Sequence, residues 1–263
     1  MVQNMSNKKS IVKYHNRNFH NVEDEIVTEF PITIHINGEE FATMVCTPTH
    51  LEELIIGFLA SEGVIFFKDE ITDLNIDVSA GFAYVTLKSN VNINQQHSKR
   101  FIGSCCGKSR QFYLQSDVRT AKTSMAKTTL EAEQCINLMN MMQENSVVFK
   151  NTGGVHNAAL CNPSEIIVDR TDIGRHNALD KLYGHSILNK IPVRDKIIVF
   201  SGRISSEVLL KASKIGVGIV LSKSAPTDLA IQLADELNIT TVGFIRGQSF
   251  NIYSHPERIK NTK

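Results

Sequence analysis

Two adjacent cysteines, Cys105 and Cys106, are the residues of this 263-residue sequence best suited to covalent chemistry. They lie within KRFIGSCCGKSR (residues 99–110), where lysines and arginines flank the pair on both sides. A thiol reacts as its thiolate, and nearby cations favour that form. Glycines beside the pair let a loop present sulfur to more than one partner. We therefore expect a reactive thiol in a mobile loop over residues 94–110.

Several chemistries compete at this pair. A dithiol redox switch is disfavoured because adjacent cysteines close a strained ring. A metal site needs further ligands, and the nine histidines include no HxxxH pair and the cysteines no CxxC pair. A persulfide or acyl carrier needs only one thiol of low pKa, which fits the segment best. A surface loop with two incidental cysteines is the alternative without function.

The other cysteines, Cys46, Cys135 and Cys161, lie in apolar strand-like or helical stretches. We expect them to be small buried hydrophobic residues. An odd total of five cysteines without an export signal indicates reduced thiols, and thus a cytoplasmic protein without a disulfide framework. The sequence predicts no catalytic metal of its own.

Composition excludes several classes of function. Hydrophobic residues make up 42% of the chain, charged residues 21%, and the formal net charge is +1. This balance is ordinary for a globular protein and gives no global field that attracts nucleic acid or an anionic membrane. No apolar run is long enough to span a bilayer, so we expect no membrane partner. The first residues, MVQNMSNKKS, lack the apolar core of a signal peptide and predict a frayed terminus.

The first half of the chain predicts an α+β region. Apolar alternation on both sides of Asn37-Gly38 predicts a hairpin. Helical spacing follows in HLEELIIGFLASEGV, with Gly63 placed to end the helix, and a second hairpin is expected to turn near Ser79-Gly81. Thr128 and Glu131 have the spacing of a capping box and predict the start of the next helix.

From that helix onward, apolar strands alternate with amphipathic helices. Such alternation is typical of an α/β fold with a mostly parallel sheet. We therefore predict fold class α/β, with an N-terminal α+β region over residues 1–125 that ends in the cysteine loop, and a C-terminal α/β cofactor-binding domain over residues 126–263.

Polar strings, most of them containing glycine, follow or precede the predicted strands of the second half. They are NTGGVH (151–156), DIGRHN (172–177), SGR (201–203), SAPT (224–227) and FIRG (244–247). In an open α/β sheet such loops meet at one edge, where glycine lets a ligand approach the backbone and arginine grips phosphate. Arg175, Arg203 and Arg246 thus suggest a phosphate-bearing ligand, although no Walker or dinucleotide fingerprint occurs.

Several collinear motifs resemble those of the formate dehydrogenase accessory proteins, the FdhD or NarQ sulfurtransferase family. They are TPTHLEELIIGFLASEGVI, SCCGKS, NTGGVHNAAL, DIGRHNALDKLYG, SGRISSEVLLKAS, SKSAPTDLAIQLA and VGFIRGQSFNIYS. They appear in the family's order and cover residues from about 25 to 258.

The resemblance implies a sulfur carrier. It accepts sulfur as a cysteine persulfide from a cysteine desulfurase and passes it to the molybdenum bis(molybdopterin guanine dinucleotide) cofactor before that cofactor enters formate dehydrogenase. It also implies a homodimer and a C-terminal core like that of cytidine deaminases. The family's cofactor-contacting stretch matches Phe244, Ile245, Arg246, Gly247, Gln248 and Ser249, with Arg246 expected on a phosphate.

The family's loop commonly carries Cys-Gly-x-Cys-Gly. An ungapped match places Cys106 at the second cysteine and Gly103 at the first, whereas a one-step gap lets Cys105 serve as the first. The persulfide position therefore stays open between Cys105 and Cys106, with Gly107 and Lys108 favouring Cys106. Deaminase activity is not expected, since His156 is followed by Asn157-Ala158 and no P-C-x-x-C motif occurs.

Two other functions remain open. The first is a chaperone that binds the cofactor without covalent sulfur transfer. The second is a metabolic enzyme acting on a nucleotide, for which the sequence places no clear general base.

Overall fold

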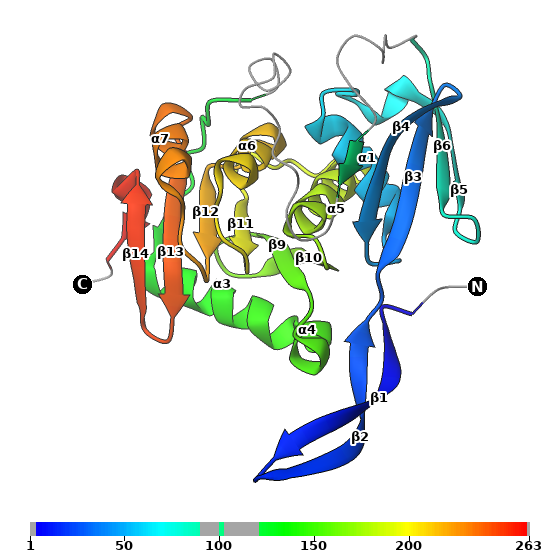
Figure 1. The fold of residues 1–263 in the computed structure, drawn as a ribbon. Helices are drawn as coiled ribbons and strands as arrows, with labels where there is room; N and C mark the ends of the chain where they lie inside the picture. The colour runs from blue at the N-terminus through cyan, green and yellow to red at the C-terminus, as the bar shows by residue number, and fades with distance from the viewer. Residues whose placement is uncertain (1–3, 90–99, 103–120, 262–263) are drawn as a thin grey trace.

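The computed structural model describes residues 4–89, 100–102 and 121–261. Two sheets with helices between them and outside them form the body, and a long hairpin projects from it (Figure 1). Helices and strands alternate through the second half of the chain, which confirms the α/β class. The cysteine loop expected over residues 94–110 lies outside the described residues apart from Arg100–Ile102.

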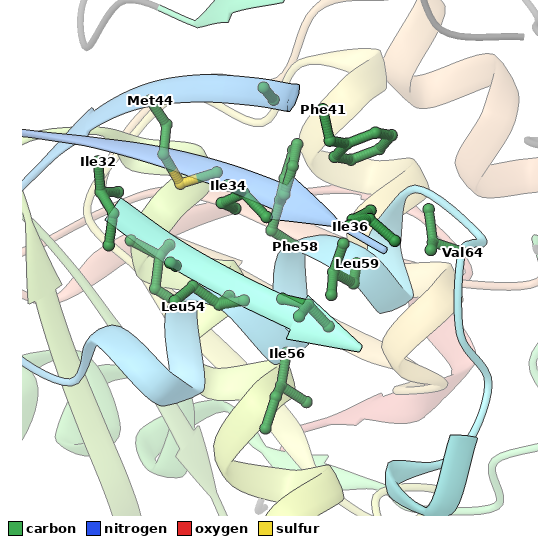
Figure 2. Close-up of a cluster of buried hydrophobic side chains, with 14 of the residues drawn as sticks. Ile32, Ile34, Ile36, Phe41, Met44, Leu54, Ile56, Phe58, Leu59 and Val64 are labelled. Atoms are coloured by element: carbon green, nitrogen blue, oxygen red, sulfur yellow. The ribbon is translucent and has the colours of Figure 1, made fainter. Parts of the chain in front are cut away.

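The N-terminal sheet has the order β5-β6-β3-β4-β7. Its strands are β3 (Phe30–Ile36), β4 (Glu39–Cys46), β5 (Ile71–Asp77), β6 (Phe82–Leu87) and β7 (Arg100–Ile102), with a short 3-10 helix, η1 (Lys68–Glu70), before β5. Both predicted hairpins are confirmed: Asn37 and Gly38 turn with φ of 50° and 88° between β3 and β4. Apolar side chains on one face pack against helix α1 (Leu51–Ser61), as Figure 2 shows.

The second sheet has the order β10-β9-β11-β12-β13-β14. Its strands are β9 (His156–Cys161), β10 (Ile166–Asp172), β11 (Ile197–Phe200), β12 (Ile219–Ser222), β13 (Thr240–Arg246) and β14 (Ser249–Ser254). The prediction of a mostly parallel sheet is wrong: only β11, β12 and β13 are parallel to one another. The short turns after β9 and β13 leave no room for a crossover helix, so β10 and β14 return antiparallel.

Helices cover both faces of this sheet. One apolar cluster joins alternate strand residues to α5 (Arg175–Leu188), α6 (Ser206–Ile215) and α7 (Asp228–Glu236). The other face packs on α3 (Ala132–Asn145), which is followed by α4 (Val147–Thr152). The predicted capping box of Thr128 and Glu131 is displaced by three residues. Helix α3 begins at Ala132, and Gln134 caps it by accepting a hydrogen bond from the Glu131 amide. Thr128 instead donates to the Asp195 carbonyl.

Helix α5 also packs against α1 and so joins the two sheets (Figure 1). Glycines make the crossing close: a Cβ added to Gly57 would lie 1.8 Å from the Asp180 carbonyl oxygen, and one added to Gly184 1.8 Å from that of Glu53. Any side chain at either position would force the helices apart. The proposed division near residue 125 remains a prediction, but α5 serves both halves.

The first two strands, β1 (Ser6–His15) and β2 (Asn18–Val27), form an arm in which they pair only with each other. The expectation of a frayed terminus is therefore wrong from Ser6 onward. Cross-strand pairing stabilises a polar segment whose composition alone gave no strand signal. At the other end of the chain, η3 (Pro256–Arg258) precedes β15 (Ile259–Lys260), which pairs with β8 (Leu130–Glu131).

Candidate functional site

The cysteine pair at 105 and 106 lies outside the described residues, as do Lys99, Lys108 and Arg110. Cys46, Cys135 and Cys161 are fully buried, which confirms the prediction made for them. Burial raises the pKa of Cys135 and of Cys161 to about 12, so neither is a thiolate at neutral pH. Among the cysteines that the structure describes, none is suited to nucleophilic chemistry.

The strand that precedes the cysteine segment, β7, lies beside the strand that leads toward the second sheet. Strand β7 runs parallel to β4, with Ile102 opposite Met44. Strand β4 ends at Cys46, and the next residue, Thr47, donates from its amide to Asp172 Oδ2 at 3.0 Å. Since β4 and β7 run in the same direction, β7 ends at the edge of its sheet that faces Asp172.

Asp172 is the centre of a buried polar network. Its Oδ2 accepts from the Thr47 hydroxyl at 3.0 Å and lies 2.7 Å from Lys181 Nζ. Its Oδ1 accepts from the Gly174 amide at 2.8 Å and from Asn177 Nδ2 at 2.9 Å. Each of these partners is a donor, so both oxygens of Asp172 act as acceptors. The network therefore fixes the first turn of α5 against the end of β4.

Arg175 and His156 lie beside this network, at the first turn of α5 and the start of β9. His156 pairs with Asp172 across β9 and β10. Burial lowers the pKa of His156, and the positive charge of Arg175 lowers it further, so the imidazole is neutral at neutral pH. Arg175 Nε is buried and has no hydrogen-bond partner among the described residues. The pair offers a cation and a neutral ring at the same edge of the sheet.

Serines at the ends of β11 and β12 join the neighbouring loops. Asn157 donates from its amide to Ser201 Oγ at 2.9 Å. Ser222 Oγ donates to the Gly202 carbonyl at 2.7 Å, and Ser224 Oγ to the Ser201 carbonyl at 3.2 Å. A Cβ on Gly202 would lie 2.9 Å from the Phe200 ring, so any other residue there would displace that ring. The glycine-containing strings therefore lie together at one edge of the second sheet.

Phe244 takes an unusual backbone conformation in this edge. Its φ is 54°, in the left-handed region that bulky residues rarely occupy, at an irregularity in the pairing of β13 with β14. The ring is 38% exposed, and the Arg246 guanidinium carbon lies 5.4 Å from its centroid. Strained residues of this kind cluster at functional sites. Phe244 and Arg246 thus form an exposed aromatic and cationic pair.

The rest of the predicted cofactor-contacting stretch has differing environments. Ile245 is 1% exposed and packs in the core, so only its backbone is accessible to a ligand. Arg246 Nε donates to the Lys223 carbonyl at 3.4 Å. Gly247 has a φ of 55° in the turn to β14, and Gln248 and Ser249 are exposed beside it. Arg203 is exposed at the end of β11. Contact of these residues with a phosphate stays a prediction.

The residues that hold this edge together are Thr47, Asp172 and Lys181. The sequence placed Asp172 in the candidate string DIGRHN without a role of its own, and neither Thr47 nor Lys181 was singled out. The signal was present in DIGRHNALDKLYG, where Lys181 lies on the same helical face as Asn177, one turn away. A lysine placed among apolar residues of a helix needs a buried anion. Pairing it with Asp172 and Thr47 required the tertiary structure.

The described residues hold neither a cluster of metal ligands nor a membrane-spanning helix. They contain no group of three or more histidine, cysteine, aspartate or glutamate side chains placed to hold a metal ion. Within the same ranges, no helix is long and apolar enough to cross a membrane.

Comparison with known sequences identifies the family. The sequence model of the FdhD/NarQ family matches residues 27–260. The chain belongs to the FdhD/NarQ family. Sulfur carrier protein FdhD of Bacillus subtilis strain 168 is 60% identical over 253 residues, covering 96% of this chain and 97% of that protein. The protein of the same name from Staphylococcus haemolyticus is 59% identical, covering 97% of each.

A solved structure supports the fold of this FdhD/NarQ chain. The crystal structure of a candidate formate dehydrogenase accessory protein from Desulfotalea psychrophila superposes with a TM-score of 0.81. It covers 98% of this chain and all of that one, at 23% sequence identity. At that identity the likeness establishes the shared architecture.

Proposed function

We propose that this protein is a cytoplasmic sulfur carrier required for formate dehydrogenase activity. It accepts sulfur from a cysteine desulfurase as a persulfide on Cys106 or Cys105 and transfers it to the molybdenum bis(molybdopterin guanine dinucleotide) cofactor. It works as a homodimer. The observation that carries this proposal is the 60% identity to a sulfur carrier protein over 96% of the chain.

The loading step exchanges one sulfur–sulfur bond for another. The carrier's thiolate attacks the terminal sulfur of the desulfurase persulfide, and the desulfurase cysteine leaves as a thiolate. The carrier gains one sulfur atom, and no external oxidant is consumed. Delivery of that sulfur as sulfide consumes two electrons, which a thiol supplies as it becomes a disulfide. The molybdenum cofactor is the substrate of this transfer.

Basic residues around the cysteine pair support the loading step. Arg100, at the start of β7, and the lysines and arginines near the pair favour the thiolate over the thiol. The position of β7 supports the delivery step, because that strand runs parallel to β4, and β4 leads into Thr47 and its contact with Asp172.

The exposed pair of Phe244 and Arg246 supports a guanine dinucleotide as part of the substrate. An aromatic ring offers a stacking surface to a base, and a guanidinium offers paired donors to a phosphate. Arg175 supplies a further cation on the same edge. These groups bind and orient the substrate, and the cysteine supplies the sulfur.

Restoration of formate dehydrogenase activity in extracts that lack this protein separates the carrier from a chaperone. The wild-type chain is expected to restore activity, and the Cys105→Ala/Cys106→Ala double variant is expected to fail while still binding GDP. Replacing buried Cys135 by alanine controls for the loss of a thiol as such. Full restoration by the double variant would favour a chaperone that acts without covalent sulfur transfer.

A further inference from the structure

The N-terminal sheet has one covered face and one open face. Alternate residues of its strands point toward α1 and belong to the apolar cluster of Figure 2. The residues between them point away from α1 and are exposed or half-buried. We call this second side of β3, β4, β5 and β6 the open face. A sheet with antiparallel pairs can leave one face to water, and polar side chains are expected there.

Three aromatic side chains lie together at the centre of the open face. The strand register places His35 of β3 opposite Tyr84 of β6, and Phe82, two residues before Tyr84, shares its side of the strand. The His35 ring centroid lies 5.3 Å from that of Tyr84 and 5.7 Å from that of Phe82. Tyr84 is 46% exposed. Single exposed aromatic residues are ordinary, but the centres of protein interfaces are enriched in such clusters. The three rings therefore indicate a contact surface.

Carboxylates flank the aromatic rings on both sides. Asp73 and Asp77 lie on β5, with Asp77 opposite Phe82 of β6, and Glu40 lies on β4 opposite His35. All three carboxylates are exposed. The sequences of β3, β4, β5 and β6 contain no lysine or arginine. The open face is therefore an aromatic centre with an acidic rim.

This charge decides between the possible occupants. Nucleic acid and anionic membranes carry phosphates, which the acidic rim repels. The same repulsion acts on the phosphate-bearing substrate proposed for the second sheet. A second copy that presented its own open face across a twofold axis would bring like charges together. The rim and the rings instead fit a protein surface with lysine and arginine side chains, which pair with carboxylates and stack on aromatic rings.

We propose that the open face docks a basic surface of the cysteine desulfurase that loads the carrier. The inference rests on the proposed function and names the surface that its sulfur donor uses. Strand β7 lies at the edge of the same sheet, and in the sequence Cys105 follows its last residue, Ile102, by three positions. A donor docked on this sheet is thus held beside the strand from which the cysteine segment continues.

The size of the open face suits a transient partner. Its four strands have six to eight residues each. With strands about 4.8 Å apart and about 3.3 Å per residue, they span roughly 14 by 20 Å. This footprint is smaller than the about 800 Å² that each partner buries in a stable complex. A carrier must release its donor after every transfer, and opposite charges speed the encounter without requiring a large interface.

Loading with two different sulfur donors tests the docking surface. One donor is a cysteine desulfurase supplied with cysteine, and the other is glutathione persulfide, a small molecule that needs no docking surface. In both reactions the carrier thiolate takes the terminal sulfur of a persulfide, and the donor leaves as a thiolate. The gain of sulfur is followed by intact mass while the carrier concentration is varied.

Asp73→Lys and Tyr84→Ala are expected to raise the KM for the carrier in the desulfurase reaction at least about tenfold, with kcat changed by less than about twofold. Neither variant should change the rate of loading by glutathione persulfide. Glu236→Lys on α7 and Tyr14→Ala on the arm are matched controls, because they make similar changes at exposed positions outside the open face. Both controls should load as the wild type does. Folding of all four variants is checked by circular dichroism.

Salt gives a second readout of the acidic rim. Between about 0.05 and 0.5 M sodium chloride, the KM of the wild type in the desulfurase reaction should rise, because exposed charges are screened. The KM of Asp73→Lys should depend less on salt than that of the wild type.

The outcomes separate this inference from the proposed function. Wild-type KM values in both Asp73→Lys and Tyr84→Ala would overturn the docking surface and leave sulfur transfer standing. Equal losses with both donors would also overturn it, since docking concerns the desulfurase alone. A wild-type protein that gains sulfur from neither donor would overturn the proposed function, and this inference with it.

Discussion

Lys181 Nζ lies 2.7 Å from Asp172 Oδ2, and neither side chain has exposed surface. Lys181 also donates to Thr47 Oγ1 at 2.7 Å and to the Thr171 carbonyl at 3.2 Å. The pair thus ties the end of β4 in the first sheet to the first turn of α5 on the second. Arg175 lies on that same turn. The ion pair therefore sets the position of a proposed substrate-binding residue, while its own two side chains stay buried.

Replacing Asp172 by asparagine is expected to destabilise the protein by about 3–5 kcal/mol, because Lys181 would remain buried without its counter-charge. Both Asp172 oxygens accept hydrogen bonds, so an amide nitrogen in place of either one faces donors. Urea unfolding followed by circular dichroism measures the change.

The Asp172→Asn/Lys181→Met double variant tests whether the pair acts as a unit. We expect it to be less destabilised than the sum of the single variants by about 2 kcal/mol or more. Additive losses would show that the two groups contribute independently, against this account.

Gly184→Ala is expected to lower the free energy of unfolding by about 3 kcal/mol or more, at or above the upper end of the losses found for overpacked cores. The added Cβ would lie 1.8 Å from the Glu53 carbonyl oxygen, so α1 and α5 must separate. Glu236→Ala, at an exposed position of α7, is the control and is expected to change stability by less than about 0.5 kcal/mol. Equal midpoints for the two variants in urea would argue against the close helix crossing.

Stability is expected to fall in acid because of Glu53. Burial of this carboxyl raises its pKa, but hydrogen bonds from Arg170 and His185 outweigh burial and hold the pKa below the ordinary value of 4.5. Because the folded pKa is the lower one, the stabilisation is complete above the unfolded pKa and is lost as pH falls through the folded pKa. In Glu53→Gln the free energy of unfolding should depend less on pH below about pH 4.5 than it does in the wild type.

His50 adds to the same trend at milder acidity. Burial, followed by the charge of Arg170, lowers the pKa of its imidazole from the ordinary 6.5. Protonation is therefore less favourable in the folded state, and the contribution of His50 to stability begins to decline as pH drops below about 6.5. The unfolding free energies of the wild type and of His50→Gln, measured between about pH 5 and 7, test this contribution. If both proteins show the same dependence of unfolding free energy on pH, the contribution of His50 is contradicted.

Phe244→Gly should weaken the binding of GDP while changing the stability of the protein little. Glycine adopts the positive φ of this position without strain, which offsets part of the lost packing of a ring that is 38% exposed. We expect a change in stability within about 1 kcal/mol and at least a tenfold weaker affinity for GDP, measured by calorimetry. Unchanged GDP affinity would remove Phe244 from the binding site.

Arg246→Ala should also weaken GDP binding, and Arg246→Lys should restore only part of it, since lysine lacks the planar fork that matches phosphate. For the preceding Phe244→Gly variant, Phe67→Ala is the control, since it also removes an exposed aromatic ring. Full rescue by lysine would indicate that only the charge matters.

Local sequence signals predicted much of the fold. Asn37-Gly38 has the conformation that a tight hairpin requires, and Gly63 takes a φ of 71° just after α1. These features depend on a few neighbouring residues, so propensity and spacing identify them. The polar strings were likewise predicted to meet at one edge of the second sheet, because the alternation of strands and helices indicates where each strand ends.

Features that depend on residues far apart in the sequence were not predicted. Thr47 and Asp172 are 125 residues apart, and only the packing of the two sheets brings them together. The polar sequence of β1 showed no apolar alternation because neither face of the arm is buried within the chain. The antiparallel neighbours of the central strands depended on short connections, which the element pattern alone did not determine.

The most direct test of sulfur transfer is the intact mass of the protein after incubation with a cysteine desulfurase and cysteine. Wild-type protein is predicted to gain one sulfur atom, removable by a thiol reductant. Of Cys105→Ala and Cys106→Ala, only the variant that keeps the carrier thiol should gain it, and the double variant should gain none. An undiminished gain of sulfur in the double variant would contradict the account.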